Sequence, residues 1–206
     1  MKYKLFYALG SAAMGTRVIL EEISAPYELI QTTIAMDEPR PPEQLKLNPN
    51  GWVPVLVWGD KAMYECAAIT VFLCDRHPEA ELAPAVGDVE RGRYLQTLVY
   101  FSSSVQNAFQ LSYYPDRFAD TPDDEPSAQR RGNRRLRETW KVINDQIGDN
   151  KWVLGGRFSA VDIYLFMLTT WLQTSRGHPS VDEFPNVKRV ADAVLPRQSV
   201  QLVYQN

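Results

Sequence analysis

Apolar and polar positions form short blocks over the first third of the chain. Tyr3–Tyr7 is rich in aromatic residues and ends before Gly10, which predicts a strand. Apolar residues recur at helical spacing over residues 12–23, which predicts a helix. The blocks that follow predict strands at 27–34, 53–58 and 61–64 and helices at 43–47 and 65–76. The predicted order is β-α-β-α-β-β-α, a sheet with helices available to cover it.

The pattern changes after Pro78, where no further strand is predicted. Helical spacing covers residues 88–111 and 128–147, residues 159–174 are apolar enough to be buried, and 181–195 and a short tail complete the chain. We therefore expect an α/β domain at 1–77, a linker at 78–87 and an all-helical domain at 88–206.

Composition narrows the class of protein. The chain has 206 residues, of which 45% are apolar and 23% charged, as in a globular protein rather than a disordered or fibrous one. Its formal net charge of -3 supplies no positive field, so neither nucleic acid nor a membrane surface is an expected partner. No apolar run reaches the length of about 18 residues that a membrane span requires.

The N-terminus and the cysteines bear on the cellular compartment. Lys2 and Lys4 precede an apolar run that ends at Gly10, as in a short secretory signal, but cleavage there would interrupt the helical pattern that follows. Cys66 and Cys74, the only two cysteines, would lie about 12 Å apart along one helix. A disulfide needs Cα atoms within about 7 Å, so a reduced, cytoplasmic protein is predicted.

The stretch Asn48-Pro49-Asn50-Gly51-Trp52-Val53-Pro54 is the most informative one. A cis bond before Pro54 would leave the N–H and C=O of Val53 pointing outward, where a short peptide could pair with them as a strand does. Base rates favour the trans form, since only about 5–6% of such bonds are cis. From these residues alone both alternatives stay open.

Glu65 follows the predicted hairpin and begins a helix. A carboxylate is favoured at that end by the helix dipole, which is the simpler interpretation. A carboxylate held there would also receive the ammonium group of a ligand, while first-turn amides would receive a carboxylate.

Taken together, the ordered segments resemble the glutathione transferase superfamily over essentially the whole chain. The segments that carry the resemblance are Lys4-Leu5-Phe6-Tyr7, Arg17-Val18-Ile19-Leu20-Glu21-Glu22, Asn48 to Pro54, Glu65-Cys66-Ala67-Ala68-Ile69 and Gly156-Arg157-Phe158-Ser159-Ala160-Val161-Asp162-Ile163-Tyr164. The resemblance implies a thioredoxin-like domain that binds glutathione, a helical domain that supplies the pocket for a second substrate, and a homodimer.

The resemblance also implies site residues. The Val53–Pro54 bond would be cis, Val53 would pair with the cysteinyl backbone of glutathione, Glu65 would bind its γ-glutamyl amine, and position 66 would bind the adjacent carboxylate. Cys66 stands where many members have serine. A thiol at a helix N-terminus can be reactive, but we expect Cys66 to act through its backbone amide.

The group that activates the glutathione thiol is predicted to be Ser11, at the turn from the first strand to the first helix. Free thiols titrate near pH 8.5, so a catalyst must favour the thiolate. Ser11 is equally suited to capping the helix, and Tyr7 competes for the catalytic role from the strand. Tyr7 and Ser103 are also expected to border the substrate pocket, together with Tyr94, Tyr100 and Phe101.

Three other features receive a structural interpretation. Ser159 and Asp162 form the pattern of a capping box. The basic run 130–135 is expected to be a solvated helix face, because acidic residues precede it. His77, His178 and the two cysteines do not have the spacing of a metal site, so no metal is expected.

The sequence therefore predicts an enzyme that transfers the sulfur of glutathione to an electrophilic small molecule. Glutathione-dependent reduction of a disulfide or peroxide, or isomerisation, would use the same thiolate and is an alternative. A non-catalytic interaction module with this fold is a second alternative. Glu65 and Val53–Pro54 favour the enzyme.

Overall fold

A four-stranded mixed sheet is the centre of the first part of the chain. The strands β1 (Tyr3–Tyr7), β2 (Tyr27–Gln31), β3 (Val55–Trp58) and β4 (Lys61–Tyr64) lie in the order β2-β1-β3-β4. β1 is parallel to β2 and antiparallel to β3, and β3 and β4 form an antiparallel hairpin. The computed structural model describes residues 2–205.

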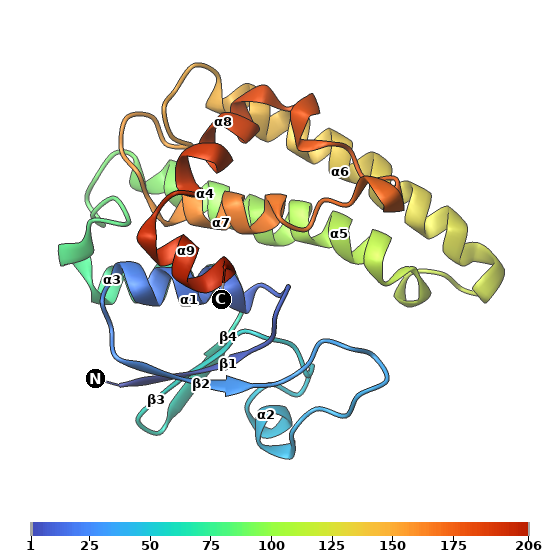
Figure 1. The fold of residues 1–206 in the computed structure, drawn as a ribbon, viewed down its shortest axis with the longest axis horizontal. Coiled ribbons are helices and arrows are strands. Elements are labelled where there is room, and N and C mark those ends of the chain that lie inside the picture. Colours follow the sequence, from blue (N-terminus) through green and yellow to red (C-terminus); the bar gives the residue numbers. More distant parts are fainter. Residues whose placement is uncertain (1, 206) are drawn as a thin grey trace. The chain divides into compact units, whose positions relative to one another are not determined.

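Helices α1 (Ala13–Glu22), α2 (Pro42–Leu47) and α3 (Cys66–Arg76) alternate with these strands, so the predicted β-α-β-α-β-β-α order and the thioredoxin-like arrangement are confirmed. α1 and α3 lie together on one side of the sheet in Figure 1. β3 begins at Val55 rather than at residue 53, because Pro54 has no amide to donate to the sheet.

The tail of the chain forms a helix, α9 (Gln198–Tyr204), that packs on α1. The structure divides into two units, and residues from Leu195 onward belong to the same unit as those up to Arg91. The division differs from the predicted ranges, in which all of 88–206 belonged to the helical domain. Arg197 and Ser199 explain the difference, since both bond the carboxylate of Glu22 on α1.

The second unit, from Gly92 to Val194, is helical. Its main helices are α4 (Arg91–Tyr100), which starts one residue before the unit boundary, α5 (Gln106–Tyr113), α6 (Glu125–Ile147), α7 (Ala160–Thr169) and α8 (Pro185–Val194). A π-helical turn over Phe101–Val105 separates α4 from α5, where one continuous helix was predicted. The hydroxyls of Ser102 and Ser103 both donate to the Val99 carbonyl, so side chains compete with the main-chain ladder there.

The core of the helical unit contains α7, which is buried from Ala160 to Leu168 as its apolar sequence predicts. Ser159 and Asp162 form the predicted capping box at its N-terminus. α5 and α6 approach closely at Gly132, where a Cβ atom would lie 2.7 Å from the amide nitrogen of Ser112. Glycine is therefore needed at this crossing.

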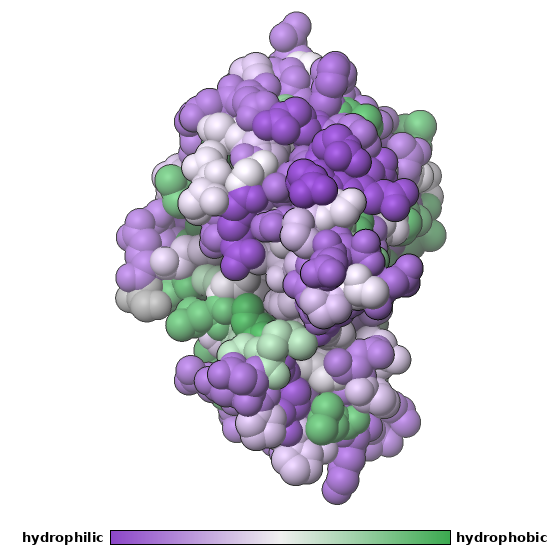
Figure 2. All heavy atoms as spheres, turned by 90° about the vertical axis from the view of Figure 1, so that its right-hand side faces the viewer, coloured by the Kyte–Doolittle hydropathy of each residue, from purple (hydrophilic) through white to green (hydrophobic). Residues whose placement is uncertain are grey.

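Hydrophilic residues cover most of the face that Figure 2 shows, with hydrophobic ones in scattered groups. Within residues 2–205, no helix combines the length and apolar character that a membrane crossing would require.

Candidate functional site

Three chain segments meet at one end of the sheet. Phe6 pairs with Val55, and Val55 pairs with Tyr64, so these residues form a row across β1, β3 and β4. Directly beyond this row lie the turn from β1 to α1, the residues before β3, and the start of α3. The sheet register thus brings Ser11, Val53 and Glu65, which are far apart in sequence, to the same end of the sheet.

Two helix N-termini also lie at this end, because α1 and α3 both begin just beyond the row. The first amides of a helix have no partner inside it, and the dipole gives that end a partial positive charge. Such an end favours anionic groups. A ligand with carboxylates or a thiolate is therefore electrostatically suited to this part of the first unit.

Val53 contributes its main chain to this end of the sheet. The Val53–Pro54 peptide bond is cis. β3 starts at Val55, and no main-chain hydrogen bond among residues 2–205 uses the Val53 amide or carbonyl. Val53 is buried, and its main-chain donor and acceptor, which no main-chain group among the described residues engages, are of the kind that pairs with an extended peptide.

Glu65 lies immediately before α3 and has an exposed side chain. Its φ of 75° is in the left-handed region, which few residues other than glycine adopt. Strained backbone of this kind is often found at functional sites. The carboxylate at this position is open to solvent and is able to meet a cationic group of a ligand.

The side chain of Cys66 is turned away from solvent and toward α1. Cys66 is 6% exposed, and its Sγ lies 3.7 Å from the carbonyl oxygen of Ala12 and 3.9 Å from Oγ1 of Thr16. The thiol is therefore a packing group between the two helix N-termini. The burial of the thiol leaves the sulfur little access to solvent, and the role of the Cys66 backbone amide at the start of α3 stays a prediction.

Ser11 occupies the turn into α1, and its hydroxyl is engaged locally. Oγ donates to the carbonyl oxygen of Ala8 at 2.6 Å and accepts from the amide of Ala13 at 3.2 Å. The residue is 6% exposed. This arrangement stabilises the turn, and the hydroxyl proton must leave Ala8 before it can be donated to a thiolate.

Tyr7 points to the helix-covered side of the sheet. It is 6% exposed, and the guanidinium carbon of Arg17 on α1 lies 5.5 Å from the centroid of its ring. Its predicted part in thiol activation or in the substrate pocket would require the hydroxyl to reach a ligand from this buried position.

Ser103 and the neighbouring aromatic residues belong to the second unit. Ser103 is exposed, and its hydroxyl donates to the Val99 carbonyl at 2.7 Å. Tyr94 and Phe101 are both 0% exposed and lie in the helical core, so no ligand on the surface reaches them. Only Ser103 and the half-buried Tyr100 are accessible from this predicted set.

Sequence reasoning missed the residues that hold the Val53 segment. Gln44 on α2 is 0% exposed and bonds the carbonyl oxygens of Gly51 and Trp52, and Asn48 bonds that of Trp52 as well. The sequence carries no clear signal for this role, because the two leucines of this short helix are the residues that a pattern would bury, and the buried one is the glutamine. Within the described part of the chain, no three His, Cys, Asp or Glu side chains lie close enough together to hold a metal ion.

Comparison with known sequences identifies both parts of the chain. The family described as "Glutathione S-transferase, N-terminal domain" matches residues 11–76, and the one described as "Glutathione S-transferase, C-terminal domain" matches residues 126–193. The chain is 26% identical over 171 residues to glutathione S-transferase GstA of Escherichia coli O157:H7, covering 82% of this chain and 81% of the relative. It is 27% identical over 168 residues to a zeta-class glutathione S-transferase of Euphorbia esula, covering 80% and 73%.

Solved structures agree with these matches. BphK, described as a bacterial GST and solved as a ternary complex, superimposes with a TM-score of 0.83 at 27% identity and covers 98% of both chains. A glutathione transferase homologue from Sulfitobacter, solved with bound glutathione, has a TM-score of 0.89 at 22% identity over 99% of this chain and 97% of its own. At 22% identity, the likeness to the Sulfitobacter structure shows the fold alone.

Proposed function

This chain belongs to the glutathione S-transferase superfamily, and we propose that it binds glutathione in its first unit and transfers the glutathione sulfur to an electrophilic small molecule. The observation that carries the proposal is the meeting of three features at one sheet end. They are the available main chain of Val53, the exposed carboxylate of Glu65 and the N-termini of α1 and α3.

Each feature suits one part of the tripeptide. The Val53 amide and carbonyl would pair with the cysteinyl main chain of glutathione, and the Glu65 carboxylate would meet the γ-glutamyl ammonium group. The first-turn amides of α3, including that of Cys66, would meet the neighbouring carboxylate. In that arrangement the cysteinyl sulfur would lie near the start of α1.

The positive end of α1 would then favour the thiolate over the thiol, because a negative charge near a helix N-terminus is stabilised. Ser11 stands at this turn and stays the predicted side chain for the role. The thiolate attacks an electrophilic carbon and forms a C–S bond. The electron pair of the broken bond departs with the leaving group, or takes a proton from water when the reaction is an addition.

Calorimetric titration of the protein with glutathione tests binding, with the thiol-free analogue in which alanine replaces cysteine as a comparison. We expect saturable binding of both glutathione and the analogue, because the proposed contacts are made mainly by the main chain and the charged ends of the tripeptide, which the two share. A panel of electrophiles, peroxides and glutathione mixed disulfides then tests the reaction. Turnover of electrophiles supports transfer, turnover confined to peroxides or disulfides supports reduction instead, and no glutathione binding by folded protein contradicts the proposal.

The homodimer that the resemblance implies stays a prediction. Light scattering coupled to size-exclusion chromatography measures it directly, against a monomer mass of 23.5 kDa.

A further inference from the structure

Gln44 is the single fully buried residue of α2, a helix whose other side chains are exposed or half-buried. An amide side chain placed in a protein interior is unfavourable unless its polar atoms all find partners. An apolar residue at this position would have no desolvation cost. The hydrogen bonds that the glutamine side chain makes are therefore what distinguishes it there.

Those hydrogen bonds link three segments of the chain. Oε1 accepts from the hydroxyl of Thr32, directly after β2, at 2.7 Å. Nε2 donates to the carbonyl oxygen of Gly51 at 3.0 Å and lies 3.4 Å from that of Trp52. Only this orientation of the amide is consistent, because the reverse would place its oxygen against two carbonyl oxygens.

Thr32 is itself fixed to the sheet, since its amide donates to the carbonyl of Tyr7 at 2.8 Å. Gln44 thus links the sheet, through Thr32, to the residues that precede Val53, and holds them at a fixed position relative to it. Asn48 adds to this support, because its Nδ2 donates to the Trp52 carbonyl at 3.0 Å. The strand ladder gives no such support there, since β3 begins at Val55.

We infer that Gln44 is a positioning residue for glutathione binding, which it serves by holding the Gly51–Trp52 main chain so that the Val53 amide and carbonyl meet the tripeptide. The inference rests on the proposed function. It predicts that disturbing the position of Val53 weakens the binding of glutathione and leaves the binding of the second substrate unchanged.

The test compares Gln44→Met with wild type in glutathione titrations and in steady-state kinetics. Methionine has a similar shape and no hydrogen-bonding amide, so the helix keeps its packing. We expect the Kd and the KM for glutathione to rise about tenfold, with the KM for the electrophile within twofold of wild type. Gln146→Met, the same change at an exposed site on α6, is the matched control and leaves all of these values unchanged.

Thr32→Val is the second variant, and it keeps the shape of the side chain while removing the donor to Gln44. We expect a rise of threefold or more in the Kd for glutathione, and this variant decides the question if Gln44→Met does not fold. Wild-type affinity in folded Gln44→Met or Thr32→Val, with only a lower melting temperature, overturns the positioning role and leaves the proposed function intact. Wild-type protein that binds no glutathione overturns both.

Discussion

Arg197 and Glu22 form a two-pronged ion pair that fixes the end of the chain to α1. Nε and one terminal nitrogen of Arg197 each lie 2.7 Å from a different carboxylate oxygen of Glu22, and the Ser199 hydroxyl donates to the same group. Only 13% of the Glu22 side chain is exposed. Burial opposes the charged form of Glu22, but the bonds from Arg197 and Ser199 outweigh it and lower the pKa of this carboxyl below its ordinary value.

Removing this pair is expected to destabilise the first unit. Arg197→Ala leaves a mostly buried carboxylate without its cation, which should lower the free energy of unfolding by about 1–3 kcal/mol. Urea unfolding at pH 7 measures the change. Arg135→Ala is the matched control, because the pair of Arg135 with Glu138 is exposed and should contribute less than about 1 kcal/mol. Equal losses in the two variants would contradict the special role of the tail.

The same pair makes a prediction about pH. The pKa of Glu22 is lower in the folded protein than its ordinary value of 4.5. The stabilisation of the fold by the charged carboxylate is therefore complete above about pH 4.5 and is lost as the pH falls through the pKa that Glu22 has in the folded protein. The difference in stability between wild type and Arg197→Ala should therefore shrink below about pH 4.5. A difference that stays constant down to pH 3 would contradict this.

His178 is expected to make the helical unit sensitive to mild acid. Its Nδ1 accepts from the amide of Gln173 at 3.1 Å, and its Nε2 lies 2.8 Å from Oγ of Ser112. Ser112 in turn donates to Oδ1 of Asn133 at 2.8 Å. These bonds form a continuous chain when the imidazole is neutral with its proton on Nε2. Burial lowers the pKa of His178, the main chain of Trp171 opposes this, and the nearby charge of Arg176 lowers the pKa further.

Because the pKa of His178 is lower in the folded protein than in the unfolded chain, the neutral histidine stabilises the fold fully above the ordinary histidine pKa of about 6.5. As the pH drops below that value, the free energy of unfolding falls. We expect wild type to lose stability between pH 7.5 and pH 5 and His178→Gln to lose less over the same range. Denaturant unfolding at both pH values measures this. Parallel losses in the two proteins would assign the acid sensitivity to other groups.

The capping box of α7 is expected to matter more than a second one on the surface. Asp162 is 0% exposed and accepts from the amides of Val153 and Ser159, both at 2.8 Å. Ser159→Ala should lower the free energy of unfolding by about 1–2 kcal/mol.

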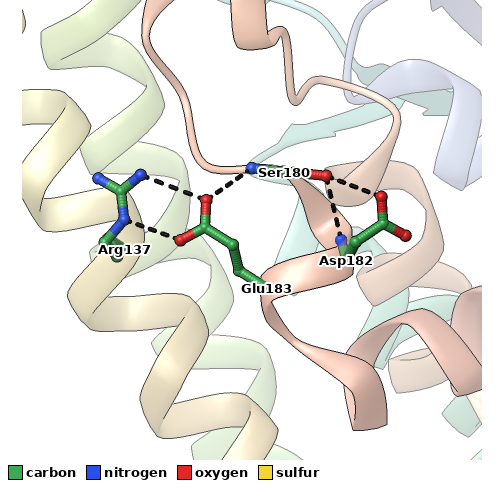
Figure 3. A network of polar contacts seen from close by, with 4 residues as sticks. All are labelled: Arg137, Ser180, Asp182 and Glu183. Atoms are coloured by element: carbon green, nitrogen blue, oxygen red, sulfur yellow. Dashed lines mark hydrogen bonds and ion pairs between the residues drawn. The ribbon is translucent and has the colours of Figure 1, made fainter.

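The comparison variant for this prediction is Ser180→Ala. Ser180 forms the exposed capping box of a short turn with Glu183, where Figure 3 shows the Glu183 carboxylate bonded to both the Ser180 amide and Arg137. Because solvent replaces the lost bond at that site, we expect a loss below about 0.5 kcal/mol. A larger loss from Ser180→Ala than from Ser159→Ala would contradict the argument from burial.

The Glu65 carboxylate is expected to hold the ammonium group of glutathione. Glu65→Gln keeps the shape of the side chain and removes its charge, so the Kd for glutathione should rise about threefold to tenfold, in keeping with an exposed ion pair. Titration calorimetry measures this, and Glu79→Gln, which changes an exposed carboxylate after α3, is the control. Unchanged affinity in Glu65→Gln would place the amine elsewhere.

Ser11→Ala separates the two roles that the residue has been given. Because the hydroxyl bonds Ala8 and Ala13, we expect a loss of about 1 kcal/mol in the free energy of unfolding. Titrating the absorbance of the bound glutathione thiolate tests catalysis separately. A raised pKa of the bound thiol in the variant supports activation by Ser11, and an unchanged pKa leaves Ser11 with the structural role alone.

The sequence by itself determined the elements of the first unit and their order. β1 and β4 have the bounds that the pattern predicted, because strand alternation and turn residues are local signals. The capping box at Ser159 was also readable, since it depends on residues three positions apart. Glu65 at the mouth of α3 followed from the helix start in the same way.

Only the tertiary structure decided how the end of the chain and the buried polar groups are used. Nothing local in Arg197 indicates a bond to Glu22, 175 residues away, and the burial of Gln44 follows from Thr32 and Gly51 converging on it. The engagement of Ser11 with Ala8 depends on the path of the turn. Hydrogen-bond partners brought together by folding leave no periodic pattern in the sequence, because a polar side chain bonds water as readily as a distant protein partner until packing removes it from water.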